Sequence, residues 1–219
     1  MSFSFGVLFD MDGVLVDSNP VHKKAIQMFC ARHGKELTES FLQEHIYGRT
    51  NKEWIPALFD GITAEETDAL GDEKEALFRS IFSPRDAVIK GLLPFLDSLR
   101  DSRIPMAVAT SAPMENARFI LEGLGITDIF NAVLSSSDVE IGKPHPDIYL
   151  KAAHRISMAP AGCVVIEDSI AGMESGLRAG ATVIGITSTH SRRELSDCHL
   201  VVDSFDELSL SALENLTGR

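Results

Sequence analysis

The strongest structural signal in this chain is a series of short apolar runs that recur along most of its length. The runs are rich in Val and Ile, and they are near-continuous rather than alternating. Strands that are buried on both faces of a parallel sheet have this pattern, whereas half-buried strands alternate apolar and polar residues. The predicted strands cover residues 5–10, 104–111, 132–137, 163–169, 181–188 and 200–204.

Helical patterns separate most of these runs. Apolar residues three and four positions apart predict helices over residues 92–102, 114–125, 146–157 and 169–180. Strands that alternate with helices through short connections are typical of an α/β fold. We therefore expect a Rossmann-like core built on a doubly wound parallel sheet.

One long segment, residues 18–86, interrupts this alternation. It has no strong strand run, and its apolar spacing predicts helices over residues 20–34, 51–59 and 64–82. An all-helical segment inserted after the first strand indicates a separate cap domain. The expected domains are a catalytic core from residues 1–16 and 87–219 and a helical cap from residues 17–86.

Composition and charge narrow the function classes. The 219 residues suffice for a core domain and a small insert, and the formal charge of −12 argues against a nucleic-acid-binding surface, which would be basic. No apolar run approaches the roughly 20 residues of a membrane span, and the N-terminal stretch lacks the basic start of a signal peptide. Three widely spaced cysteines without a CxxC pair favour reduced thiols. We expect a cytoplasmic protein without a membrane or nucleic-acid partner.

Polar side chains follow several of the predicted strands. Parallel α/β sheets bind ligands at the carboxyl ends of their strands, so these side chains should meet at one edge. Lys143 lies in a loop before a predicted helix, and the strand-end residues are Asp10, Asp12, Thr110, Ser111, Glu167, Asp168, Ser169, Thr187 and Ser188.

The chemistry of this set favours phosphoryl transfer. Crowded carboxylates need a cation, and their oxygens suit Mg²⁺, so Asp10, Asp168 and Glu167 predict a magnesium site. A carboxylate can act as the nucleophile, while a second acid protonates the leaving oxygen and later activates water. Lys143 and Thr110 could bind the oxygens of the transferred phosphoryl group.

Four segments in this order carry a family resemblance: "DMDGVLVDS", "VATSA", "GKPHPDIY" and "VIEDS". They resemble the four motifs of the haloacid dehalogenase superfamily, and the D-x-D-G start matches its phosphotransferase branch. The inserted segment resembles the small four-helix cap of the subgroup that contains β-phosphoglucomutase and sugar phosphatases.

The resemblance implies a role for each motif residue. Asp10 would be the nucleophile, and Asp12 would be the general acid and base, with its backbone carbonyl on Mg²⁺. Thr110 would bind the phosphoryl group, Lys143 would pair with the nucleophile and the phosphate, and Glu167 and Asp168 would complete the metal site.

In the cap, His22 and Lys74 match positions that the subgroup places over the active site. Residues 47–51 resemble its specificity loop, so Arg49 and Asn51 are expected to contact substrate. Ser111 in the core is a further candidate for substrate binding, or it could bond only the local backbone.

One departure from the subgroup bears on the reaction. The mutase has Ser-Lys-Asn after its second motif, and these residues hold the second phosphate of a bisphosphate intermediate. Here the stretch is Ala112-Pro113-Met114, and Asn51 stands where the mutase has its cap arginine. This difference favours a Mg²⁺-dependent phosphatase that hydrolyses a small sugar or polyol phosphate through an aspartyl phosphate. Mutase-type phosphoryl transfer and a non-catalytic phosphometabolite-binding role stay open as alternatives.

Two further expectations complete the sequence analysis. The Lys143–Pro144 bond is a candidate cis peptide, because X–Pro bonds adopt this form far more readily than other bonds. A cis bond there would aim Lys143 inward, toward Asp10. A cap that opens and closes is compatible with a monomer.

Overall fold

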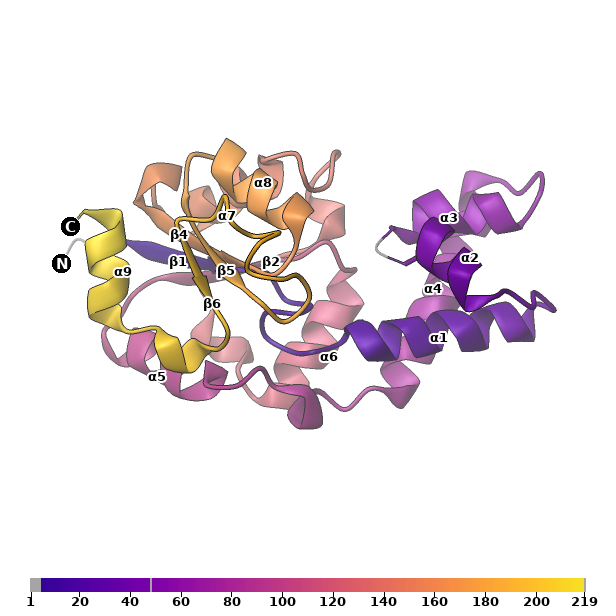
Figure 1. Cartoon of the computed structure of the whole chain (residues 1–219), viewed down its shortest axis with the longest axis horizontal. Helices are drawn as coiled ribbons and strands as arrows, with labels where there is room; N and C mark the ends of the chain where they lie inside the picture. The colour runs from indigo at the N-terminus through magenta and orange to yellow at the C-terminus, as the bar shows by residue number, and fades with distance from the viewer. Residues whose placement is uncertain (1–4, 48, 219) are drawn as a thin grey trace. The chain divides into compact units, whose positions relative to one another are not determined.

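The computed structural model describes residues 5–47 and 49–218. Residues 1–4 of the N-terminal stretch and Gly48 of the predicted specificity loop lie outside the described residues. The chain forms two compact units (Figure 1). We call residues Met1–Asp17 with Pro84–Arg219 the core unit, and Ser18–Ser83 the cap unit.

The core unit is built on a six-stranded sheet in which every strand pairing is parallel. The spatial order is β3-β2-β1-β4-β5-β6, so the chain winds outward from β1 in both directions. This topology confirms the predicted doubly wound α/β fold. The strands are β1 (Gly6–Phe9), β2 (Met106–Ala109), β3 (Ala132–Leu134), β4 (Cys163–Glu167), β5 (Thr182–Ile186) and β6 (Leu200–Val202).

Helices cover both faces of this sheet. In Figure 1, α7 and α8 lie on one face and α5 and α6 on the other. Leu8 of β1 packs in a buried cluster with residues of α7 and α8, whereas the next residue, Phe9, contacts Phe95 of α5 at 6.4 Å between ring centroids. Successive strand residues point to opposite faces, so burial on both sides explains the near-continuous apolar runs. The core helices are α5 (Leu92–Asp101), α6 (Met114–Leu124), α7 (Asp147–Arg155), α8 (Ile170–Arg178) and α9 (Leu210–Thr217).

Some elements differ from their predicted extents. The apolar run at 132–137 predicts a longer strand than β3, which ends at Leu134. The backbone N–H of Ser135 donates to the Asp138 carboxylate at 2.9 Å, and this bond turns the chain into a short 3-10 helix. Local side-chain bonds of this kind end a strand without any change in apolar content.

The cap unit contains α1 (Asn19–Arg32), α2 (Glu39–His45), α3 (Asn51–Leu58) and α4 (Ala64–Ile81), and its described residues include no strand. The four-helix prediction for the cap is confirmed. Thr63 and Glu66 form a capping box at the start of α4, which satisfies backbone donors that have no partner within the helix. Phe29 contacts Trp54 and Phe59 in the apolar centre of this unit, with ring centroids 5.6 and 6.1 Å apart.

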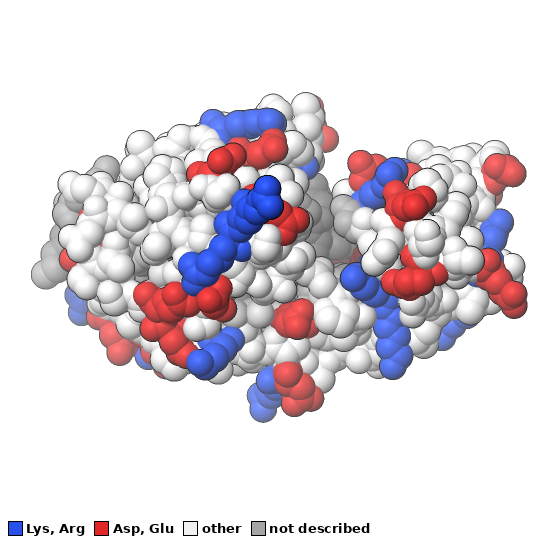
Figure 2. Space-filling model, viewed as in Figure 1, with Lys and Arg blue, Asp and Glu red and all other residues white. Residues whose placement is uncertain are grey.

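Charged side chains of both signs are mixed on the face shown in Figure 2. Several of the surface cations of the core unit are paired: Arg192 lies 2.9 Å from Asp203, and Lys90 lies 3.0 Å from Asp206. Among the described residues, none of the helices has the length and apolar character that crossing a bilayer requires.

Candidate active site

Two neighbouring strands bring the acidic residues together. Asp10 directly follows β1, Glu167 is the last residue of β4, and Asp168 comes next. Because β1 and β4 pair in parallel with Phe9 opposite Ile166, their carboxyl ends coincide. Ligand oxygens of all three acids lie within 4.8 Å of one another, and the three residues are buried. Three of the four sequence-predicted metal ligands, all except Asp12, therefore form one cluster.

Lys143 supplies the counter-charge to this cluster. Its Nζ lies 2.6 Å from Oδ1 of Asp10 and 2.6 Å from Oε1 of Glu167, and its side chain is 6% exposed. The peptide bond between Lys143 and Pro144 is cis, and the lysine points at Asp10, which confirms both parts of that prediction.

Glu167 is held by donors from several elements. Oε1 accepts from Lys143 Nζ and, at 2.6 Å, from the hydroxyl of Tyr149 on α7. Oε2 accepts from the backbone N–H of Asp168 at 3.1 Å and from Ser169 Oγ at 3.1 Å. Sequence reasoning assigned no role to Tyr149, although this residue lies within the segment "GKPHPDIY" and in the helix predicted over residues 146–157. The sequence feature that could have revealed this contact is a tyrosine at a buried helix position, because a buried Tyr hydroxyl needs a polar partner.

Burial and mutual repulsion shift the titration of these groups. Burial raises the pKa of Asp10 well above its ordinary value, and the negative charges of Glu167 and Asp168 raise it further. The positive charge of Lys143 lowers this pKa but does not outweigh the other causes. Burial and the nearby Glu167 charge raise the pKa of Asp168 to about 7. For Lys143, burial favours loss of the proton, but Asp10 and Glu167 outweigh it and the pKa of Lys143 rises. One lysine thus faces three acids, so a divalent cation fits the charge balance and the hard oxygen donors.

The turn after β1 depends on a glycine. Gly13 has φ +79°, and a Cβ atom there would lie 1.9 Å from Oδ2 of Asp168. Asp12 is half-buried in this turn, next to Gly13. Only a residue without a side chain allows the turn to approach Asp168 this closely. This contact explains why glycine follows the two aspartates.

β2 places the predicted phosphoryl-binding residues at the same edge of the sheet. Thr110 directly follows β2, which pairs with β1, and it is 1% exposed. Its Oγ1 accepts from the backbone N–H of Ala112 at 3.0 Å. Ser111 is exposed beside it.

The loop after β5 supplies further contacts, of which the sequence analysis placed only Ser188 at this edge of the sheet and missed Thr189 and His190. Ser188 Oγ donates a short hydrogen bond to the carbonyl of Gly13, and Thr189 hydrogen-bonds the Asp168 carboxylate. Nδ1 of His190 lies 2.9 Å from the carbonyl oxygen of Asp168. Three consecutive side chains of this loop therefore contact the turn after β1 and Asp168.

Comparison with known proteins agrees with this geometry. The family model for haloacid dehalogenase-like hydrolases matches residues 6–180. This chain belongs to that family. A crystal structure of a family IA, variant 3 hydrolase of the haloacid dehalogenase class from Entamoeba histolytica superimposes with a TM-score of 0.89 at 31% identity, covering 98% of this chain and 100% of that one.

Two proteins with similar sequences are named for different activities. It is 31% identical to hexitol phosphatase A of Escherichia coli strain K12, over 96% of this chain and 95% of that protein. It is 28% identical to the β-phosphoglucomutase of Bacillus subtilis strain 168, over 94% and 92% of the two chains. The chain is therefore similar over most of its length to a phosphatase and to a mutase.

Three of the four substrate-contact candidates that the sequence places in the cap lie together in the cap unit. Lys74 Nζ lies 3.0 Å from Nδ1 of His22 and 2.8 Å from Oε1 of Glu75, and Asn51 Nδ2 donates to the same Glu75 oxygen at 2.8 Å. Glu75, which sequence reasoning missed, is the common partner of Lys74 and Asn51. Arg49 differs, because it is exposed and its guanidinium donates to the backbone carbonyl of Glu44 at 3.2 Å.

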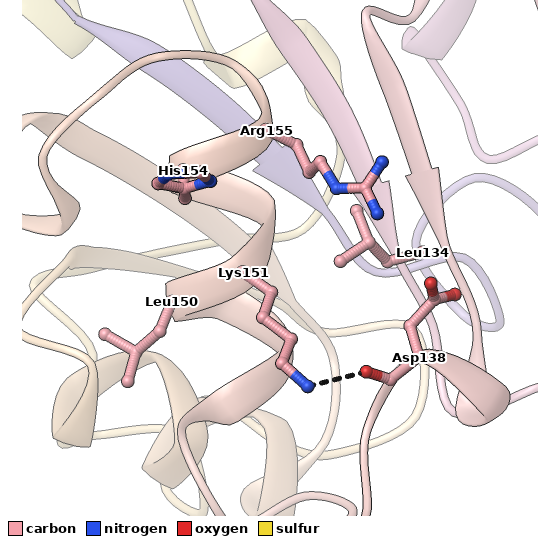
Figure 3. Close-up of a pocket in the computed structure, with 6 residues that line it drawn as sticks. All are labelled: Leu134, Asp138, Leu150, Lys151, His154 and Arg155. Atoms are coloured by element: carbon pink, nitrogen blue, oxygen red, sulfur yellow. Dashed lines mark hydrogen bonds between the residues drawn. The ribbon is translucent and has the colours of Figure 1, made fainter.

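A surface hollow of about 410 Å³ lies elsewhere on the core unit (Figure 3). Lys151 on α7 reaches across it and donates to the backbone carbonyl of Asp138 at 2.8 Å. Its lining consists of Leu134, Asp138, Leu150, Lys151, His154 and Arg155. None of these residues belongs to the carboxylate cluster, so we assign the chemistry to the cluster and not to this hollow.

Gly172 offers a stability test of the site. A Cβ atom there would lie 1.8 Å from Oε1 of Glu167, whereas a Cβ at Gly71, inside α4, would meet its nearest neighbour at 3.5 Å. We expect Gly172→Ala to lower the melting temperature and the activity, because the added Cβ would displace the Glu167 carboxylate. This loss should occur although Ala is more favourable than Gly inside a helix by about 1 kcal/mol. The matched control Gly71→Ala should raise stability by about 0.5–1 kcal/mol. Calorimetric melting of both variants measures the contrast, and equal effects would contradict the assigned close contact at Glu167.

Proposed function

We propose that this haloacid dehalogenase-like chain is a phosphomonoesterase that hydrolyses a small sugar or polyol phosphate through an aspartyl phosphate. The observation that carries the proposal is the Asp10 carboxylate, buried at the end of β1 and held 2.6 Å from Lys143 among acids that suit a metal ion. The relative named hexitol phosphatase A supports the substrate class.

The proposed reaction has two steps on the residues of the core unit. An oxygen of Asp10 attacks phosphorus, the bond from phosphorus to the ester oxygen breaks, and Asp12 donates its proton to the leaving alcohol. Asp12, now a carboxylate, takes a proton from water, which attacks the aspartyl phosphate and releases inorganic phosphate. Lys143 and Thr110 bind phosphoryl oxygens, where the negative charge is concentrated.

The proposed metal is Mg²⁺, held by the side chains of Asp10, Glu167 and Asp168 together with the backbone carbonyl of Asp12. When bound, it supplies positive charge that offsets the repulsion between the acids and the phosphoryl group. The loop from Ser188 to His190 holds Asp168 and the Gly13 turn in place for this site.

The cap residues would select the part of the substrate that is not transferred. The cluster of His22, Asn51, Lys74 and Glu75 offers both donors and acceptors, which suits a leaving group with several hydroxyls. Arg49 and Ser111 are further proposed substrate contacts. The stretch Ala112-Pro113-Met114 has no side-chain donor for a second phosphate, and this favours hydrolysis over mutase chemistry.

A panel of phosphorylated metabolites, with p-nitrophenyl phosphate as a general substrate, tests the proposal through Mg²⁺-dependent release of inorganic phosphate. The mutase alternative predicts a different result. Incubation with β-glucose 1-phosphate and a trace of the 1,6-bisphosphate would then give glucose 6-phosphate without free phosphate. If the wild-type protein released phosphate from none of the esters, the non-catalytic binding role would be favoured.

The pKa of Asp168 predicts how metal binding depends on pH. Burial and the Glu167 charge raise this pKa to about 7, and a carboxyl must lose its proton to bind Mg²⁺. The ionised fraction rises as pH increases through 7, so the Kd for Mg²⁺ should be about 10-fold weaker at pH 6 than at pH 8. Isothermal titration calorimetry of Mg²⁺ into the metal-free protein at pH 6 and at pH 8 measures the two Kd values. A Kd that does not change between pH 6 and pH 8 would contradict the assignment.

A further inference from the structure

All three donors of the Lys143 ammonium group already have acceptors within the protein. An ammonium carries three N–H donors and has no acceptor. In the structure, these donors reach Asp10 Oδ1 at 2.6 Å, Glu167 Oε1 at 2.6 Å and the Tyr149 hydroxyl at 3.0 Å. Lys143 can therefore bind a phosphoryl oxygen fully only if one of these three bonds is given up.

The bond to Tyr149 is the one most easily exchanged. It is the longest of the three, and its acceptor is neutral, whereas hydrogen bonds to carboxylates are charge-assisted and stronger. The hydroxyl of Tyr149 also donates to Glu167 at 2.6 Å, so it keeps a partner after Lys143 leaves. A phosphoryl oxygen carries negative charge and is a better acceptor for the ammonium than a phenol oxygen.

We propose that one N–H of the Lys143 ammonium group alternates between two acceptors. In the substrate-free protein it donates to the Tyr149 hydroxyl oxygen, and when substrate or phosphate binds it donates to a phosphoryl oxygen instead. Tyr149 is thus a positioning residue that keeps Lys143 aimed at the site and lowers its net affinity for phosphate. This inference rests on the proposed function, because it requires that Lys143 bind the phosphoryl group.

The surroundings of Tyr149 make a clean variant available. The side chain is fully buried, and Lys143 Nζ also lies 4.8 Å from the centroid of its ring. Tyr149→Phe keeps the ring, its packing and this cation–π contact, and it removes only the hydroxyl. The variant then leaves one Lys143 donor without its acceptor in the substrate-free protein.

The test is calorimetric titration of inorganic phosphate into the Mg²⁺-loaded protein. For Tyr149→Phe we expect a Kd about 3- to 10-fold tighter than that of the wild type, because phosphate no longer competes with one hydrogen bond. The inhibition constant of phosphate against p-nitrophenyl phosphate hydrolysis should fall by the same factor. A structural defect would weaken binding, so an unchanged or weaker Kd would overturn the inference.

Ser169→Ala is the matched control. It removes a donor to Glu167 Oε2 at 3.1 Å and leaves the partners of Lys143 intact, so phosphate affinity should not tighten. Equal tightening in both variants would trace the effect to the charge of Glu167 and would overturn the role of Tyr149. Absence of phosphate binding to the wild type and both variants would overturn the proposed function itself. Melting temperatures establish that each variant is folded during the titration.

Discussion

Asp10→Asn is expected to reduce phosphate release by about 10³-fold or more while the protein stays folded. The amide has nearly the shape of the carboxylate, but it is a poor nucleophile and cannot form the aspartyl phosphate. Steady-state hydrolysis of p-nitrophenyl phosphate measures the loss. Asp128→Asn, the same change at an exposed aspartate of the core unit, should leave the rate unchanged. Full activity in Asp10→Asn would contradict the nucleophile assignment.

A second variant separates the roles of the two aspartates. The p-nitrophenolate group leaves without needing a proton, so Asp12→Asn should still transfer the phosphoryl group to Asp10. Hydrolysis of the aspartyl phosphate needs a base, and it should slow strongly in this variant. We expect a burst of p-nitrophenol equal to the enzyme concentration, followed by slow turnover. A variant with no burst would place Asp12 in the first step as well.

Lys143→Met should strongly lower both the stability of the protein and its activity. The substitution leaves Asp10 and Glu167 buried without the ammonium that lies 2.6 Å from each. Removal of one partner from a buried ion pair costs about 3–5 kcal/mol. Loss of a charged donor to the phosphoryl group should lower kcat/KM by about 10²- to 10³-fold.

The stability loss should depend on pH. Burial already raises the pKa of Asp10 with Lys143 present, and removal of the lysine raises this pKa further because its attraction lowers it. A carboxyl whose pKa is higher in the folded state than in the unfolded state stabilises the fold at low pH and loses this effect as pH rises. The metal-free variant should therefore be less destabilised at pH 6 than at pH 8.

Calorimetric unfolding is the suitable measurement, because the single tryptophan, Trp54, lies in the cap unit and its fluorescence reports on that unit. The control is Lys151→Met, which removes an exposed lysine of α7 that donates to a backbone carbonyl. This control should change stability by no more than about 0.5 kcal/mol. Equal stability of wild type and Lys143→Met at pH 8 would contradict the role of Lys143 as counter-charge.

We propose that the core unit carries out phosphoryl transfer and that residues outside the carboxylate cluster select the reaction. The core unit holds the residues of the proposed phosphoryl transfer, and the relatives named hexitol phosphatase A and β-phosphoglucomutase share similarity over nearly their whole length. These two relatives are named for different reactions, and we propose that the difference arises outside the carboxylate cluster. The cap residues around Glu75 and the stretch Ala112-Pro113-Met114 are the proposed places for it.

The sequence by itself determined the sheet, the helical insert and the positions of the acids. Near-continuous apolar runs predict strands buried on both faces, and parallel strands end at one edge, so Asp10, Glu167 and Asp168 had to converge. The inward aim of Lys143 was also predicted, from a candidate cis bond between Lys143 and Pro144, because X–Pro bonds adopt the cis form far more readily than other bonds.

The tertiary structure alone decided which other side chains complete the site. Tyr149 appears in the sequence as the last residue of "GKPHPDIY" without an assigned role, and Thr189 and His190 appear as loop residues beside the strand-end Ser188. Glu75 appears as one charge among several on α4. Their contacts with Lys143, Gly13, Asp168 and Asn51 join residues far apart in the chain. Periodicity specifies the face on which a side chain lies, but the partner that it meets there is set by how the elements pack in three dimensions.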